Sequence, residues 1–312
     1  MARSIEARLA ALRDEPDRAD VLAALRGTVG VLVAAAVKHV ERLGLTDELA
    51  PAFERLCDQA AKRDPGCRGK VAIARYLHDA DVWDELVLAR GVAFVQHEPA
   101  FGGPVDTAAE LRGVCGISYA HAGRPDALDV LASLLADPER TARIAAAQGL
   151  GDAGHIDASA LLRYKALAGD LEPDVQAAVL EALLRLAGAA ALDFIARFLP
   201  AHDERAELAA YALGGSRLAA AVPILQAWLD ACSPRQRREV GYLALALCRD
   251  DGATAQLVEV ARAGDRADAL AAAKALATFA ADPAMAAKLR DAAQARDAAL
   301  AAEILRTVDG RR

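Results

Sequence analysis

The sequence of 312 residues lacks several features that would point to particular classes of protein. No stretch alternates Val, Ile or Thr with polar residues, so β-strands are not expected. No uncharged stretch of about 18 apolar residues occurs, so no membrane-spanning helix is expected. The N-terminal segment is charged throughout and lacks the apolar stretch of a signal peptide. These absences favour a cytoplasmic protein that does not bind membranes.

Cysteine is also scarce, and its spacing carries no recognised motif. The chain has five cysteines, an odd number, and none of them forms a CxxC pair: Cys57, Cys67, Cys115, Cys232 and Cys248. This spacing predicts neither a disulfide framework nor a zinc site, and it favours reduced thiols. No recognised ligand spacing joins the histidines to each other or to the cysteines. We therefore expect no metal and no cofactor.

Motifs of catalysis are absent as well. No serine lies in a G-x-S-x-G context, and the glycines of "GLGDAG" (149–154) do not follow a strand, as a dinucleotide site requires. The formal net charge of −7 argues against a protein that binds nucleic acid or an anionic membrane over its whole surface. The sequence contains no recognisable catalytic constellation, and we do not predict an enzyme.

Alanine and leucine in helical order make up much of the remaining sequence, and both favour helices. Six segments align when their closing large residues are superimposed, which indicates an internal repeat. These segments span 106–120, 137–151, 172–186, 203–215, 233–247 and 264–277. Their closing residues are 30 to 33 positions apart: Tyr119, Leu150, Leu183, Leu213, Leu245 and Leu276.

An amphipathic helix is also predicted before several of these segments, for example at 125–137, 189–199 and 218–231. The unit is then a helix–turn–helix of about 30 residues, which is too thin to bury its apolar faces alone. We expect a right-handed, all-α solenoid of about eight such units. It would occupy residues 28–309 as one continuous domain, after an N-terminal helical cap at 1–27.

Within the repeat, Asp137-Pro138 is expected to cap the following helix. This opening, together with Arg143, the pair Ala146-Ala147 and the pair Leu150-Gly151, resembles the short HEAT-like repeats first described in phycobilisome lyases. The segment "GGPVDTAAELRG" also resembles a segment of bacterial HEAT-repeat proteins. The resemblance implies the solenoid fold, but it does not imply one activity, because this architecture serves many functions.

The resemblance implies that the second helix of each pair lines a concave face. A non-catalytic scaffold that binds proteins through this face is the function we expect. The predicted face is a mosaic of charge, with an acidic group at 203–207 between two basic groups, which suits a specific protein partner better than a uniform polyanion. The candidate basic residues are Arg68, Lys70, Arg112, Arg143, Arg235, Arg237 and Arg238.

Two other functions stay open by analogy with HEAT-like proteins. One is a lyase or isomerase acting on a bilin, and the other is a protein acting on nucleic acid, like the HEAT-like DNA glycosylases. Armadillo-type solenoids hold extended peptides with a ladder of Asn side chains. This chain contains no Asn, so binding of that type is not available to it.

The stretch "QHEPAFGGPV" (96–105) interrupts the repeat, because the step from Leu77 to Tyr119 is about ten residues longer than the others. Inserted loops in solenoids often bind partners. In one interpretation the loop holds His97 and Phe101 in a fixed pose for a partner. In the other it is a spacer, in which Phe101 folds back onto the core and Asp106 caps the next helix.

Overall fold

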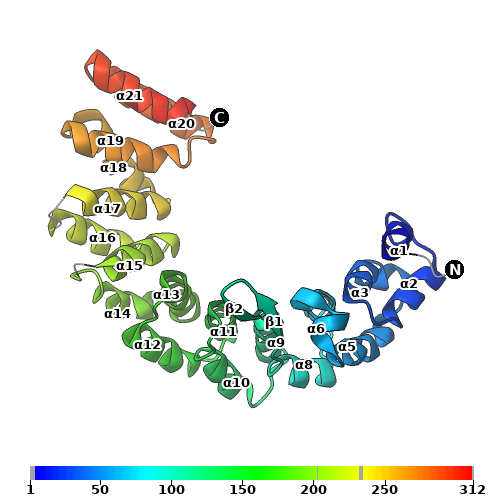
Figure 1. Ribbon diagram of the computed structural model, residues 1–312. Helices are drawn as coiled ribbons and strands as arrows, with labels where there is room; N and C mark the ends of the chain where they lie inside the picture. The colour runs from blue at the N-terminus through cyan, green and yellow to red at the C-terminus, as the bar shows by residue number, and fades with distance from the viewer. Residues whose placement is uncertain (1–3, 202, 232–234, 311–312) are drawn as a thin grey trace. The chain divides into compact units, whose positions relative to one another are not determined.

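The computed structural model describes residues 4–201, 203–231 and 235–310, without the side chains of 235–237. The chain is mostly helical, which confirms the expected all-α class in its coarse form (Figure 1). It forms two compact units, unit 1 (Met1–Gly154) and unit 2 (His155–Arg312). The predicted division into a cap and one continuous domain stays a prediction. None of the helices in the described ranges is both long and apolar enough to cross a lipid bilayer.

Unit 1 contains the helices up to α11 and a short β-hairpin. Its elements are α1 (Ile5–Ala11), α2 (Arg18–Leu25), α3 (Gly30–Val37), α4 (Val40–Leu43), η1 (Thr46–Glu48), α5 (Leu49–Cys57), α6 (Ala60–Arg63), η2 (Pro65–Cys67), α7 (Arg68–Asp79), α8 (Glu85–Gly91), β1 (His97–Ala100), β2 (Gly103–Asp106), α9 (Ala109–His121), α10 (Ala127–Leu134) and α11 (Arg140–Asp152). Helices α3, α7, α9 and α11 pack in succession, each against the next, and α8 and α10 cover one side of α9.

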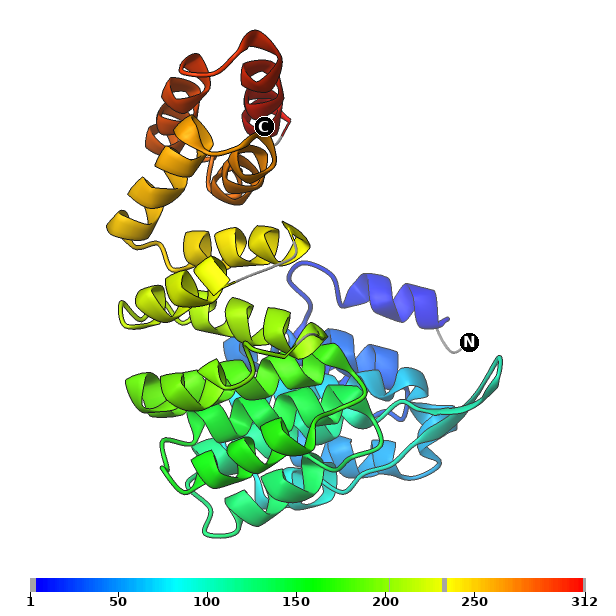
Figure 2. The same cartoon turned by 90° about the vertical axis from the view of Figure 1, so that its left-hand side faces the viewer.

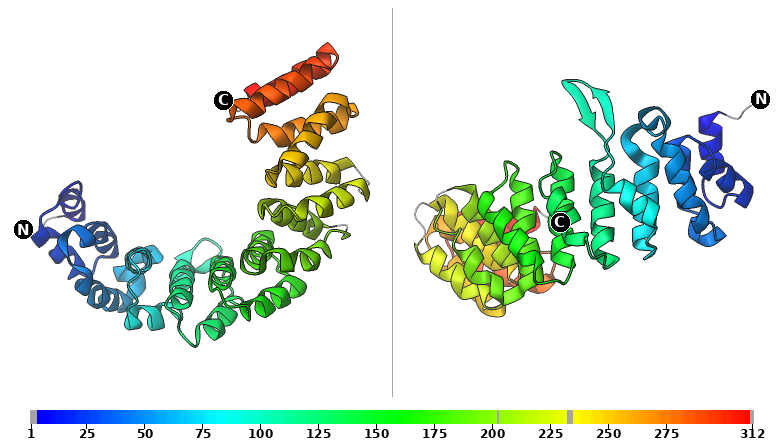
Figure 3. Two further views of the ribbon diagram at one scale, coloured as in Figure 1. Left: turned by 180° about the vertical axis from the view of Figure 1, so that it is seen from behind. Right: turned by 90° about the horizontal axis from the view of Figure 1, so that it is seen from below.

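Unit 2 has the same organisation without strands among its described residues. Its elements are α12 (Ala158–Ala168), α13 (Pro173–Ala187), η3 (Gly188–Ala191), α14 (Leu192–Ala196), α15 (Glu204–Gly215), α16 (Ala221–Ala231), α17 (Arg235–Leu247), α18 (Asp251–Ala263), α19 (Arg266–Ala277), α20 (Pro283–Gln294) and α21 (Ala298–Asp309). The odd-numbered helices from α13 to α21 pack in one row, and the even-numbered helices form a second layer against them (Figure 3).

The six helices predicted from the aligned segments are confirmed. They end within one residue of the predicted positions and begin up to three residues later. The large residues that close the segments are buried in both units, from Tyr119 in α9 to Leu276 in α19. Small residues let the helices approach closely, since a side chain on Gly113 of α9 would begin 2.6 Å from the Cβ of Ala145 in α11.

The cap predicted at Asp137-Pro138 is wrong. Helix α11 begins at Arg140, and its N-cap residue Glu139 makes no side-chain capping bond. The carboxylate of Asp137 instead accepts a hydrogen bond from the Glu139 N–H at 2.8 Å and is bound by Arg112 of α9. Arg112 competes with the helix end for the Asp137 carboxylate. It lies on the neighbouring helix, 25 positions earlier in the chain, so a local sequence pattern could not reveal the contact.

The expectation that strands are absent is wrong for one segment. Residues 97–106 form a two-stranded antiparallel hairpin, β1–β2, between α8 and α9. Asp106 is also not the N-cap of α9, because that position belongs to Ala108. The hairpin lies where the sequence placed an inserted loop, and it projects away from the helices of unit 1 (Figure 2).

Candidate functional site

The register of the hairpin determines which backbone groups face outward. Thr107 N–H donates to the Gln96 carbonyl at 2.9 Å, so these two residues form a hydrogen-bonded pair. Such pairs alternate along antiparallel strands, and therefore Pro99 and its partner Pro104 belong to an outward-facing pair. Proline has no N–H to donate. Both edges of the hairpin thus lack a donor where an added strand would need one.

The tip of the hairpin presents an aromatic side chain to solvent. Phe101 is fully exposed (110% of its reference area), and Val105 on β2 is about half exposed (48%). Gly102 and Gly103 follow Phe101 with φ angles of +97° and +132°, which residues with a side chain rarely adopt. The interpretation in which Phe101 folds back onto the core is therefore wrong.

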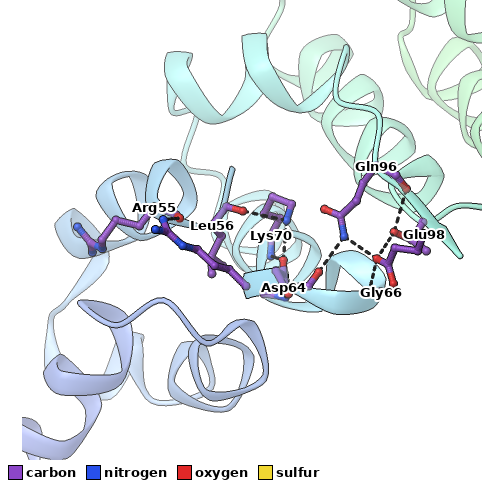
Figure 4. Close-up of polar contacts among 10 residues, drawn as sticks. Arg55, Leu56, Asp64, Gly66, Lys70, Gln96 and Glu98 are labelled. Atoms are coloured by element: carbon purple, nitrogen blue, oxygen red, sulfur yellow. Dashed lines mark hydrogen bonds and ion pairs between the residues drawn. The ribbon is translucent and has the colours of Figure 1, made fainter. Parts of the chain in front are cut away.

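The base of the hairpin is held by the carboxylate of Glu98 on β1. Its Oε1 accepts hydrogen bonds from the Gly66 N–H at 2.7 Å, from Gln96 Nε2 at 2.6 Å and from Thr107 Oγ1 at 2.7 Å (Figure 4). Burial by itself would raise the pKa of Glu98, but these donors outweigh it and the pKa lies below its usual value. Glu98 is therefore a carboxylate at neutral pH, and it connects the hairpin to the turn before α7.

That turn is organised by a buried ion pair between Asp64 and Lys70. The two side chains are fully buried, and Lys70 Nζ lies 2.8 Å from Asp64 Oδ2. The Asp64 carboxylate also accepts the N–H groups of Gly69 and Lys70 in the first turn of α7. Lys70 Nζ further contacts the carbonyl of Leu56 at 3.4 Å and lies 5.2 Å from the ring centroid of Phe94 (Figure 4).

A second buried network holds the other strand, β2, at the base of the hairpin. Arg112 of α9 binds Asp137 through two parallel hydrogen bonds of 2.7 and 2.8 Å, and it binds Asp106 of β2 at 2.6 Å. It also donates to the carbonyl of Phe94 at 2.8 Å. Burial alone would raise the pKa of Asp106, but hydrogen bonds from Gln96 N–H, Ala108 N–H and Arg112 lower it below its usual value. The hairpin is thereby anchored at both strands.

The candidate residues predicted from the sequence fall into distinct environments. Arg68, His97 and Phe101 are exposed in unit 1. Lys70 and Arg112 lie in the interior with the partners given above, and they present no charge to a partner. Their role is to hold the hairpin and the turn beside it.

The remaining candidates lie farther along the chain. Arg143 is half-buried on α11 and donates to the carbonyls of Asp137 and Pro138 at 2.8 Å each. Arg238 lies in unit 2, on α17, and pairs with Asp268 at 2.8 Å. The side chains of Arg235 and Arg237 lie outside the described residues. Among the candidate side chains that the structure describes, Lys70 and Arg112 lie at the base of the hairpin and Arg68 lines the space beside it.

A cavity of about 850 Å³ lies beside the base of the hairpin, within unit 1. Its lining includes Glu98, the exposed cations Lys62 and Arg68, and the apolar side chains of Val29 and Val31. No motif of the sequence predicts that Lys62, Asp64 and Glu98 lie in this part of the structure. The Asp-Pro-Gly sequence at 64–66 is a turn signal that could have drawn attention to this region.

The described cysteines are poorly suited to nucleophilic chemistry. Cys67 and Cys115 are buried, and burial raises the pKa of each thiol to about 12. Cys57 and Cys248 also have raised pKa values because of burial. At neutral pH all four are therefore protonated thiols, which are weak nucleophiles.

No protein-family model matches the chain, and a search of curated protein sequences found no similar protein.

Proposed function

We propose that this chain is a non-catalytic protein-binding scaffold built as a HEAT-like α-solenoid of about eight helix pairs. Three features support this proposal: the 30-residue repeat, the burial of its closing residues and the two-layer packing of successive helices in each unit. Such folds bind partners through the concave face formed by the second helices. The relationship to HEAT-repeat proteins is part of the proposal.

The observation that carries the proposal is the exposed Phe101 at the tip of an anchored hairpin. Aromatic side chains on rigid elements bind with little loss of conformational freedom and are enriched at the cores of protein interfaces. Burial of a phenylalanine side chain by a partner would contribute about 1.5–3 kcal/mol. A solvated tip would gain nothing from such a residue, so we assign Phe101 a direct contact with the partner.

The hairpin also restricts the mode of binding. Addition of a partner strand needs outward N–H groups, and Pro99 and Pro104 remove one from each edge. We therefore propose that the partner receives the Phe101 side chain in a pocket and does not extend the two-stranded sheet. His97, which is exposed on β1, lies at the opposite end of this strand from the tip.

The proposal is tested by photo-crosslinking from position 101. A crosslinking amino acid replaces Phe101 in the full-length chain, the captured protein is identified, and its affinity for the native chain is measured with purified components. We expect Phe101→Ala to weaken that affinity at least tenfold and to leave the thermal unfolding temperature unchanged. Tyr164→Ala, which removes an exposed aromatic residue from unit 2, is the matched control and should bind like the native chain.

Equal affinities of the native chain and the Phe101→Ala variant would contradict the assignment of the tip. The scaffold function itself requires that crosslinking captures a protein and that this protein binds the purified chain in a defined ratio. If no such protein is found, the scaffold function is contradicted.

A further inference from the structure

We propose that the cavity beside the hairpin binds an acidic segment of the protein partner, with a carboxylate placed between Lys62 and Arg68. This inference rests on the proposed scaffold function and specifies the chemistry of the partner. The cavity lies within unit 1 and is bordered by the C-terminal end of α6, the N-terminal end of α7 and the base of β1.

The cavity lining carries positive charge that is only partly paired within the described part of the chain. Three cations line the cavity, Lys62, Arg63 and Arg68. Arg63 is paired with Asp58 at 2.8 Å, whereas Lys62 and Arg68 form no side-chain hydrogen bond or ion pair with any residue that the structure describes. Lys62 and Arg68 outnumber the single carboxylate of the lining, Glu98, and this local excess of positive charge on a chain of net charge −7 favours an anionic ligand at this place.

Arg68 lies at the N-terminal end of its helix. It is the first residue of α7, whose first turn contains no acidic side chain, so its charge faces the positive end of the helix dipole. The nearby carboxylate of Asp64 is already bound to Lys70 and to two backbone N–H groups of α7. A cation at the positive end of a helix dipole is unfavourable, and Arg68 makes no side-chain hydrogen bond or ion pair within the described residues that would offset this.

Glu98 supplies one negative charge to the cavity lining and so offsets only one of the two cations. Its Oε1 already accepts three hydrogen bonds that fix the hairpin. No ion pair joins Glu98 to Lys62 or Arg68 within the described part of the chain. The cavity thus keeps an excess of positive charge, and an incoming carboxylate meets two flexible cations.

The apolar lining indicates what accompanies the carboxylate. Val29 and Val31 contribute to the wall, and Ile5 is about half exposed there. A segment in which acidic and aliphatic residues alternate matches this mixture. Phe101 is three residues from Glu98, or about 10 Å along an extended strand, so a partner that receives Phe101 can also reach the cavity.

The test uses the full-length chain and a fluorescein-labelled peptide of 12 residues in which Glu and Leu alternate. A second peptide has Gln in place of every Glu. Fluorescence anisotropy should show at least tenfold tighter binding of the Glu peptide by the native chain. The double variant Lys62→Glu, Arg68→Glu should lose at least tenfold of that affinity, while circular dichroism shows an unchanged helical content.

The matched control is the double variant Arg13→Glu, Lys38→Glu. Both residues are exposed cations of unit 1 that line a different cavity, and the described structure gives their side chains no partner. The change of net charge is the same, so binding within twofold of the native chain is expected. An equal loss of affinity in both double variants would mean general electrostatic attraction and would overturn the proposal.

Three further outcomes also overturn it. These are equal binding of the Glu and Gln peptides, no binding of either peptide, and displacement of the peptide by millimolar acetate or inorganic phosphate, which would identify a small anion as the ligand. Affinity measurements with the partner captured from position 101 distinguish a failure of this inference from a failure of the scaffold function. If Phe101→Ala weakens that complex and Lys62→Glu, Arg68→Glu does not, the scaffold stands and the acidic-segment site is wrong.

Discussion

Arg112 occupies a buried position between two aspartates that come from different segments, Asp106 of β2 and Asp137 before α11. Two nitrogens of the planar guanidinium, Nε and Nη2, donate to the two carboxylate oxygens of Asp137. A lysine has a single ammonium group and could not form this pair of bonds. Burial lowers the pKa of Arg112, and its hydrogen bonds to Asp137 and Asp106 raise it by more, so the charge is retained. Arg112 is therefore a structural residue of the hairpin base.

Replacement of Arg112 by Met should lower the free energy of unfolding by about 3–5 kcal/mol, because two buried carboxylates lose their counter-charge. Urea denaturation at pH 7 measures this change. The control is Arg75→Ala, which removes an exposed ion pair with Glu110 and should change stability by less than about 1 kcal/mol. Similar losses in the two variants would contradict the buried network.

Asp106 predicts a specific dependence of stability on pH. Because its pKa is lowered in the folded chain, it contributes stability above its unfolded pKa of about 4, and this contribution is lost as pH falls through the folded value. Asp106→Asn should therefore be less stable than the native chain by about 1–3 kcal/mol at pH 7. The difference should shrink below pH 4, and urea denaturation at both pH values would measure it. A constant difference would contradict the lowered pKa.

At the scale of elements, the helices of each row depend on small residues at their crossings. A side chain on Gly214 of α15 would begin 2.2 Å from the backbone oxygen of Ala244 in α17. The neighbouring Gly215 has open space around the same position. Of these two adjacent glycines, only Gly214 is required by the close approach of α17. The tertiary contact, and not the local sequence, distinguishes them.

Gly214→Ala should destabilise unit 2 by about 1–3 kcal/mol, because α15 and α17 must separate to admit the methyl group. Gly215→Ala should leave stability unchanged or raise it by up to about 1 kcal/mol, through the better helix propensity of alanine. Thermal unfolding of the two variants provides the measurement. The close crossing of α15 and α17 would be wrong if both alanines were tolerated equally.

The helices could be predicted from the sequence because their signals are local. Leu183 and Leu213 recur at one position of the repeat, and both are buried as this recurrence predicts. The hairpin could not be predicted, because Pro99, Pro104 and two glycines in ten residues are ordinarily signs of a loop. Its strands form because their base is fixed by side chains from other helices, among them Arg112.

At the scale of the whole molecule, the chain divides after Gly154 into two compact units, and each contains buried apolar residues. In each unit a helix packs mainly against its neighbours along the chain. Stability in such an arrangement is approximately a sum of local terms. A substitution in one unit therefore affects distant helices of the other unit weakly.

Hydrogen exchange measured by mass spectrometry can test this independence. Arg112→Met should accelerate amide exchange in α7, α9 and α11 and leave α19, α20 and α21 at the native rates. The physical reason is that the lost contacts lie within unit 1. A uniform acceleration across both units would show that the chain unfolds as a single cooperative body.

The sequence by itself determined the helical class and the positions of the main helices, because periodic apolar residues act over one or two turns. The tertiary structure decided which charged side chains are buried in ion pairs and which are exposed to solvent. Gly66 meets Glu98 across 32 positions and Arg112 meets Asp137 across 25, so only folding brings these groups together. The same contacts hold the base of the hairpin, whose tip presents Phe101 to solvent. Lys62 and Arg68 face the cavity beside this base.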